Sequence, residues 1–146
     1  MSKTLICTMG TPRSGKSIWS KTQRLKGIPV VCPDTIRLAV HGKLIDWSKE
    51  YIVWNTAKIM VKYFFEQGYG TVILDATNYN RKNRKSPKKW AEEIGDCKVV
   101  FKVFNTSREE CIERAIADGR EELIPVIEKQ ASMWSPLGED EQEYLE

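Results

Sequence analysis

The sequence predicts an α/β fold in which a parallel four-stranded sheet is flanked by helices. Three observations support this: four short apolar runs, helical patterns between them, and a glycine-bearing turn directly after the first run. Strands that alternate with helices form parallel sheets covered on both faces. The 146 residues have room for one domain, and the hydrophobic content of 41% is ordinary for a globular chain.

The periodicity of apolar residues assigns the individual elements. Strands are expected at residues 4–9, 28–32, 71–74 and 98–104. Helices are expected at residues 18–26, 35–40, 48–67, 81–94, 107–116 and 125–134, and the late ones should include a short C-terminal lid. Seven aromatic residues at helical spacing are expected in the core: Trp19, Trp54, Tyr63, Phe64, Phe65, Trp90 and Trp134.

Charge divides the chain into a basic body and an acidic end. Residues 138–146 carry five acids and no base, so a total charge of +3 leaves +8 on residues 1–137. We expect residues 1–137 to form the domain and residues 138–146 an acidic, disordered tail. The densest basic run spans residues 81–89, and its Arg81 and Arg84 are candidate contacts for a polyanionic substrate. The alternative for such a run is a solvated helix face.

Composition narrows the cellular setting. No apolar stretch approaches the length of a membrane span, and the first residues lack a signal-peptide layout. The four cysteines show no C-x-x-C spacing, which argues against structural zinc and for thiols of a cytosolic protein. We therefore expect a cytoplasmic protein without membrane association, and no obligate protein partner is evident.

Residues 10–17 match the phosphate-binding loop pattern G-x-x-x-x-G-K-[ST] between a predicted strand and a predicted helix. Such a loop wraps backbone N–H groups around phosphates, and glycine permits the positive φ and close approach that this needs. The fold is thus predicted to be of the P-loop NTPase type, with ATP and Mg²⁺ as cofactors. The predicted ATP-binding residues are Gly10, Thr11, Pro12, Arg13, Ser14, Gly15, Lys16, Ser17 and Ile18.

Two carboxylates follow predicted strands and should meet at the carboxyl edge of the sheet. Asp34 is the candidate general base for an acceptor hydroxyl, and Arg37 lies three residues on, where it can hold a neighbouring phosphate. An N-cap is the alternative role for Asp34. Asp75 ends the third strand and, with Ser17, is expected to bind Mg²⁺, although an aspartate there can also initiate a turn.

The ordered set of motifs resembles a known family. Asp34-Thr35-Ile36-Arg37 looks like the Asp-x-x-Arg acceptor motif of polynucleotide 5′-kinases, and Asp75-Ala76-Thr77-Asn78 resembles their Asp-Ala-Thr-Asn segment. The likeness to the phage-type kinase domain extends over nearly the whole chain. It implies that Lys16 and Asp34 are catalytic, that Thr77 and Asn78 lie on the substrate side, and that Arg114 is a catalytic lid arginine.

The resemblance has three departures. Arg13 stands where the family's loop commonly has glycine. Arg120, the candidate for a second catalytic lid arginine, lies on the far side of Gly119 from the family's usual position. No phosphatase or ligase module follows, so an end-healing enzyme of this kind would perform only the kinase half.

These features predict an ATP-dependent kinase that phosphorylates the 5′-hydroxyl of DNA or RNA. The first alternative is a P-loop kinase of a nucleoside or another small hydroxyl metabolite, because Asp-x-x-Arg can serve such an acceptor equally well. The second is a nucleotide-dependent binding module or ATPase, in which ATP turnover would not respond to any hydroxyl acceptor.

Overall fold

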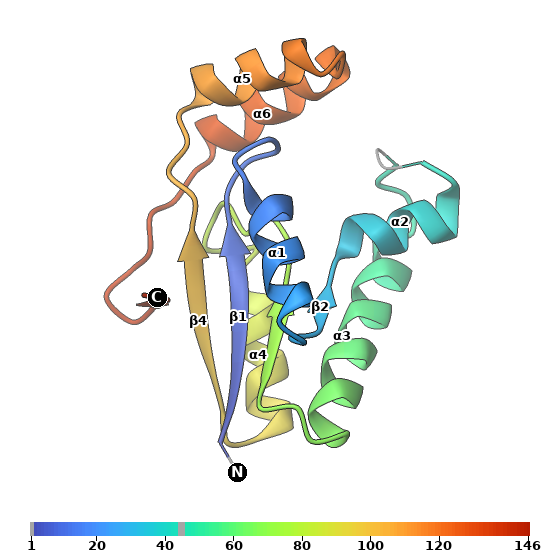
Figure 1. Cartoon of the computed structure of the whole chain (residues 1–146), viewed down its shortest axis with the longest axis vertical. Helices are drawn as coiled ribbons and strands as arrows, with labels where there is room; N and C mark the ends of the chain where they lie inside the picture. Colours follow the sequence, from blue (N-terminus) through green and yellow to red (C-terminus); the bar gives the residue numbers. More distant parts are fainter. Residues whose placement is uncertain (1, 44–45) are drawn as a thin grey trace.

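The computed structural model describes residues 2–43 and 46–146 and shows a parallel five-stranded sheet in the order β2-β3-β1-β4-β5. Figure 1 shows α1 in front of the sheet, α4 behind it, and helices α5 and α6 together above its carboxyl end. The α/β fold predicted from the sequence is confirmed, and the number of strands is corrected from four to five.

The elements follow one another as the alternating pattern predicted. The strands are β1 (Lys3–Met9), β2 (Val30–Val31), β3 (Thr71–Leu74), β4 (Cys97–Val103) and β5 (Gln142–Glu143). The α-helices are α1 (Lys16–Leu25), α2 (Pro33–His41), α3 (Glu50–Glu66), α4 (Lys85–Ile94), α5 (Arg108–Ala117) and α6 (Ile124–Ser132). A short 3₁₀ helix, η1 (Glu121–Leu123), joins the last two.

Alternation along β1 divides the core between the two faces of the sheet. Leu5 and Cys7 belong to the large cluster that packs against α3 and α4, whereas Ile6 belongs to a smaller cluster with Trp19 of α1. A strand points successive side chains to opposite faces, so both faces of β1 must be covered. Among the described residues, no helix has the length and apolar character needed to cross a membrane.

Helices α5 and α6, with η1 between them, correspond to the predicted C-terminal lid and share a small core of their own. Cys111, Ala115 and Ile127 are fully buried between α5 and α6, with Ile112 and Leu123 packed beside them. Ser107 caps α5 by accepting a hydrogen bond from the backbone N–H of Glu110. These contacts make the two helices one packed unit above the sheet.

The acidic segment 138–146 is not a disordered tail. Its β5 pairs in parallel with β4, with Gln142 opposite Val100, and the backbone N–H of Tyr144 donates to Phe101 O at 2.8 Å. The Trp19 indole lies 6.2 Å from the Tyr144 ring. A strand of two residues has no periodicity to detect, which explains why the sequence pattern missed it.

Two further expectations are corrected by the structure. The helix expected at 81–94 begins at Lys85, because residues 81–84 form turns. Tyr63 is 57% exposed on α3 and therefore does not belong to the core, whereas Trp54 and Trp90 do pack together there.

Candidate active site

The phosphate loop connects β1 to α1 and depends on two glycines for its shape. A Cβ on Gly10 would lie 2.5 Å from Ser14 Oγ and 3.1 Å from Phe104 Cβ, so any side chain there collides. Gly15 has φ +109° and begins α1 in a conformation that L-residues rarely adopt. Arg13 also has a positive φ, +68°, without being glycine. Loop closure therefore stores backbone strain at Arg13.

The loop and the start of α1 fit a phosphate ligand. In α1, which is described throughout, no side chain caps the N-terminus and no acid lies in the first turn. The free N–H groups and the helix dipole there favour an anion. Within the loop, Ser14 Oγ is buried and has no hydrogen-bond partner among the described residues. An unpaired polar atom in the cradle is consistent with a ligand completing it.

The remaining loop residues surround this cradle. Thr11 is buried and its hydroxyl lies 3.4 Å from Cys111 Sγ of the lid, while Pro12 is half-buried. Ser17 lies exposed in the first turn of α1, where its hydroxyl can reach a metal on the phosphates. Ile18 is 76% exposed, so only its backbone N–H is suited to a phosphate contact.

Lys16 and Asp75 supply opposite charges at the floor of the site. Lys16 Nζ donates to Thr11 O at 2.8 Å across the loop. Burial lowers the pKa of Lys16, and the carboxylates of Asp75 and Asp34 partly offset this. Burial raises the pKa of Asp75, against the effects of Lys16 and of hydrogen bonds from hydroxyl groups. Each charge thus partly offsets the effect of burial on the pKa of the other, although burial has the larger effect on both.

The segment after β3 is held against β1 and the loop. Thr8 Oγ1 donates to Ala76 O at 2.7 Å and lies 3.3 Å from Asp75 Oδ1, which fixes the end of β3. Thr77 O accepts from the Gly10 backbone N–H at 2.9 Å. Asn78, at φ +45°, donates from Nδ2 to Thr8 O at 2.8 Å and is 2% exposed. In this structure Thr77 and Asn78 support the loop, and their expected substrate contacts stay predictions.

Arg37 is clamped between carboxylates beside the phosphate loop. Its Nε lies 3.0–3.1 Å from the two carboxylate oxygens of Glu50, its Nη2 donates to Glu50 Oε1 at 2.7 Å, and its Nη1 donates to Asp34 Oδ1 at 2.6 Å. Burial alone lowers the pKa of Arg37, but the Glu50 and Asp34 contacts raise it overall. The side chain of Asp34 remains 63% exposed, so its carboxylate is accessible to an acceptor.

The basic run after β3 does not present all its charges to solvent. Arg84 is fully buried and donates to Glu141 and to backbone carbonyls, and Arg81 pairs with Asp140 and Glu141. The expectation that Arg84 contacts a substrate is therefore not met in this structure. Its physical reason is the acidic segment, which folds back onto these two arginines and neutralises them.

Besides the contact between Thr11 and Cys111, the lid reaches the loop at Arg13. Arg114 Nη1 donates to the backbone O of Arg13 at 3.0 Å, and the Arg13 guanidinium pairs with Asp118 just after α5. Arg120 lies farther along the lid and pairs with Glu122 of η1. The structure thus brings Arg114 to the loop but does not bring Arg120 there.

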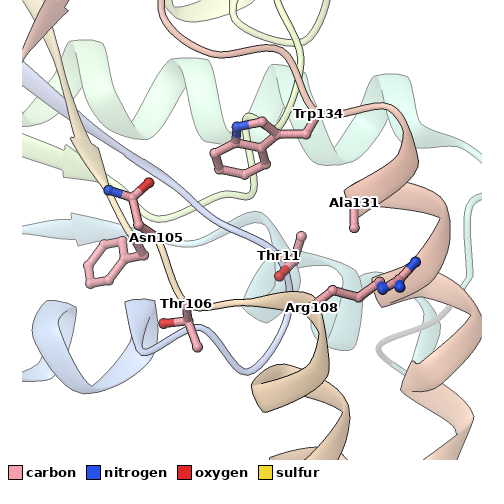
Figure 2. A pocket seen from close by; sticks show the side chains of 7 residues that line it. Thr11, Asn105, Thr106, Arg108, Ala131 and Trp134 are labelled. Atoms are coloured by element: carbon pink, nitrogen blue, oxygen red, sulfur yellow. The ribbon is translucent and has the colours of Figure 1, made fainter.

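A cavity of about 250 Å³ opens beside the loop, between β4 and the lid. Figure 2 shows Trp134 above this space and Arg108 and Thr106 below it, with Thr11 between them. Thr106 Oγ1 donates to Ser14 O at 2.8 Å, which joins the cavity wall to the phosphate loop. The complete lining is Thr11, Phe104, Asn105, Thr106, Arg108, Ala131 and Trp134.

Three residues of the site escaped the sequence analysis. Glu50 and Trp47 surround Arg37 although they lie ten or more residues from it in the chain, and Trp134 was assigned to the core. No local pattern links Glu50 to Arg37. An exposed tryptophan in a polar connection, as at Trp47, was the one available signal.

The family model for an AAA domain, AAA_33, matches residues 5–130. The chain belongs to this AAA domain family. With the loop described above, the family identifies a P-loop domain of the kinase type, a class that binds nucleotides. Among curated proteins, none matches the chain significantly.

Solved structures share the fold of this AAA domain. A chain of the Pnkp1/Rnl/Hen1 complex is 25% identical with a TM-score of 0.67, and the match covers 77% of this chain and 39% of that one. A chain of the Pnkp1/Rnl/Hen1 RNA repair complex is 19% identical with a TM-score of 0.69, covering 99% and 52%. The chain therefore spans about half or less of these relatives.

A gluconokinase from Sinorhizobium meliloti 1021 is 17% identical with a TM-score of 0.64. That match covers 97% of this chain and 80% of the gluconokinase. At these identities, the gluconokinase and the RNA repair complex establish the common fold.

Proposed function

We propose that this domain transfers the γ-phosphoryl group of ATP to the 5′-hydroxyl of a polynucleotide. The observation that carries the proposal is the exposed Asp34 carboxylate, which Arg37 holds at 2.6 Å beside the phosphate loop. Its negative charge acts on Lys16, where it partly offsets the lowering of the Lys16 pKa by burial. A carboxylate whose charge acts on the phosphate-binding lysine is suited to accept the proton in phosphoryl transfer to a hydroxyl.

On the donor side, the loop holds the β- and γ-phosphates, and Lys16 leaves Thr11 O to contact them. Ser17 and Asp75 would hold Mg²⁺, directly or through its water ligands. A bound Mg²⁺ neutralises charge on the β- and γ-phosphate oxygens. Arg114, already at the loop, adds positive charge from the lid side.

The cavity beside the loop suits the adenine ring. It is continuous with the loop through Thr11, and Trp134 offers an aromatic surface for stacking. Asn105 supplies both donor and acceptor groups for the edge of a base. Its volume of about 250 Å³ lies near the lower end for small-molecule sites.

On the acceptor side, Asp34 accepts the proton of the hydroxyl as the hydroxyl oxygen bonds to the γ-phosphorus. The bond from that phosphorus to the bridging oxygen breaks, and ADP leaves. Arg37 has five N–H groups, of which Glu50 and Asp34 occupy three, and the other two have no partner among the described residues. The two that remain can bind the phosphate next to the acceptor hydroxyl.

The exposed positive charges of residues 81–89 support a polyanionic acceptor, but through other residues than the sequence predicted. Since Arg84 is buried and Arg81 is paired, the exposed charges of the basic run that have no ion-pair partner among the described residues are Lys82, Lys85 and Lys89. The likeness to chains of an RNA repair complex agrees with a nucleic-acid substrate. These lysines replace the two arginines as the proposed contacts.

A small neutral hydroxyl compound is the second candidate acceptor. Asp34 and Glu50 carry two negative charges against the single positive charge of Arg37, and a neutral hydroxyl enters such a site without repulsion. A sugar kinase from Janibacter sp. HTCC2649, which is 14% identical to this chain with a TM-score of 0.63, is an example of a kinase for this class of acceptor.

One experiment separates these acceptors. The protein is incubated with γ-labelled ATP and with 5′-hydroxyl DNA, 5′-hydroxyl RNA, nucleosides or sugars, and label transfer is measured. We expect transfer to the oligonucleotides, with a KM that rises steeply with salt because phosphate contacts release counterions. Transfer to sugars alone, with little salt dependence, would contradict the proposal. ATP turnover that no hydroxyl accelerates would point to a binding module or ATPase.

A further inference from the structure

Trp47 is an exposed aromatic side chain beside the candidate acceptor site. It lies in the connection between α2 and α3 and is 53% exposed, although tryptophan is among the largest apolar side chains. The Arg37 guanidinium carbon lies 4.7 Å from the centroid of its ring. Part of the indole thus covers the cation while much of it still faces solvent.

The surroundings of Trp47 hold it in place. Asp46 Oδ1 accepts hydrogen bonds from the backbone N–H and the hydroxyl of Ser48, which forms a turn around Trp47. Beneath the indole, Arg37 is fixed by Glu50 and Asp34. A ring supported by a fixed cation and a hydrogen-bonded turn loses little conformational entropy when a ligand stacks on it.

Three groups that can recognise different parts of one nucleotide therefore lie next to one another, since Arg37 contacts both Asp34 and Trp47. Asp34 can accept a hydroxyl proton, Arg37 has two N–H groups that no described residue occupies and that can bind a phosphate, and Trp47 offers a flat apolar surface. The 2.6 Å and 4.7 Å contacts that join them keep all three within the dimensions of a single nucleotide. A hydroxyl, a phosphate and a base attached to one ribose would meet all three.

We propose that Trp47 is the stacking surface for the nucleobase of the nucleotide that carries the acceptor 5′-hydroxyl. This inference rests on the proposed function, because it assumes a polynucleotide acceptor. Every base has a π-face, so stacking on Trp47 selects for a base at the 5′ end without selecting its identity. The site thus distinguishes a 5′ end with an intact base from one without a base.

The test compares two 5′-hydroxyl oligonucleotides, one with an intact 5′-terminal base and one abasic at that position. Wild type, Trp47→Ala and Trp47→Phe are assayed for kcat and KM, with Tyr63→Ala as the control for loss of an exposed aromatic elsewhere. We expect Trp47→Ala to raise the KM for the intact oligonucleotide about ten- to a hundredfold, with a smaller change in kcat. Trp47→Phe should retain most of the affinity, and Tyr63→Ala should behave as wild type.

With the abasic oligonucleotide, wild type and Trp47→Ala should have the same raised KM, because no base remains to stack. Equal losses on both oligonucleotides would overturn the inference, since Trp47 would then act only by supporting Arg37. An unchanged KM in Trp47→Ala would also overturn it. Thermal unfolding of each variant checks the fold, and Trp47→Phe preserves the test if the alanine variant is unstable.

A failure of the proposed function can be distinguished from a failure of the stacking role of Trp47. Binding of both oligonucleotides is measured by fluorescence anisotropy without ATP. If wild type neither binds nor phosphorylates any oligonucleotide, the polynucleotide acceptor and the role of Trp47 both fall. If wild type phosphorylates them and Trp47→Ala does so equally well, only the stacking surface falls.

Discussion

Arg84 and Glu141 form a fully buried ion pair that ties the last strand to the site segment after β3. Arg84 Nε donates to Glu141 Oε2 at 2.8 Å, and Nη2 donates to Oε1 at 3.1 Å. The other guanidinium N–H groups donate to the backbone carbonyls of Asn78, Ser135 and Pro136 at 3.0–3.2 Å. One side chain thus satisfies all its donors and connects three segments.

Breaking this pair should destabilise the domain strongly. Glu141→Ala should reduce the free energy of unfolding by about 3–5 kcal/mol, because it leaves the buried Arg84 guanidinium without a carboxylate. Arg84→Met should also destabilise the domain, but less through charge, because Lys88 Nζ still lies 2.6 Å from Glu141 Oε2. The double variant should lose less than the sum of the two, as coupled residues do. Urea unfolding measures these values. Arg108→Gln, which breaks an exposed pair with Glu109, is the control and should change little.

Acid should weaken the domain through the same carboxylate. Although burial alone raises the pKa of Glu141, its contacts with Arg84, Gly138 and Lys88 lower the pKa from 4.5 to about 2. A carboxyl with a lowered folded-state pKa stabilises above pH 4.5, and this contribution is lost as the pH falls toward 2. Thermal unfolding from pH 6 to 2.5 should show a shallower decline in Glu141→Gln than in wild type. Parallel declines would mean that other groups govern acid unfolding.

Lys16→Ala should abolish phosphoryl transfer in a folded protein. Lys16 donates to one carbonyl in the loop, so its removal affects the charge on the phosphates more than the packing. Loss of such a contact costs about 3 kcal/mol or more in the barrier, roughly a hundredfold in rate. Label transfer from ATP measures the rate, and circular dichroism checks the fold. A folded Lys16→Ala protein with near-normal turnover would remove the loop from the mechanism.

Substitutions of the candidate base Asp34 and of the residues that support it, Arg37 and Glu50, should change different kinetic constants. Asp34→Asn should lower kcat about a hundredfold or more with little change in ATP affinity, because it removes the base at constant size. Arg37→Ala should mainly raise the acceptor KM. Glu50→Gln should share part of that effect, since it loosens two of the three contacts that orient Arg37. If these variants instead lose ATP binding, the segment does not belong to the acceptor side.

The contact between Arg13 and Asp118 should hold the lid to the loop. Asp118→Ala should raise the ATP KM and acceptor-independent ATP hydrolysis by about two- to fivefold, the range for an exposed ion pair. The charge reversal Arg13→Asp with Asp118→Arg should recover most of the loss, and aspartate tolerates the positive φ at position 13 better than most residues. A double variant no better than the singles would show that the pair does not position the lid.

Local chemistry explains why so much of the donor side could be predicted. Gly10, Gly15 and Lys16 form a contiguous pattern, and the strand before it and the helix after it follow from apolar periodicity. Asp34 and Asp75 could be assigned to the sheet edge because each directly follows a strand of a parallel sheet. These inferences need only neighbours in the chain and one topological rule.

Contacts between residues distant in the chain determined the features of the site that the sequence pattern could not predict. Glu50 meets Arg37 because α2 and α3 pack together, and Glu141 neutralises Arg84 because β5 adds to the edge of β4. A run of basic residues looks the same in sequence whether it faces solvent or a buried carboxylate. The sequence by itself determined the α/β fold, the phosphate loop and the carboxylates at the sheet edge, since these depend on local spacing. Only the tertiary structure decided which charges remain free for a ligand, because burial and ion pairing depend on residues far apart in the chain, such as Arg84 and Glu141, which are 57 residues apart.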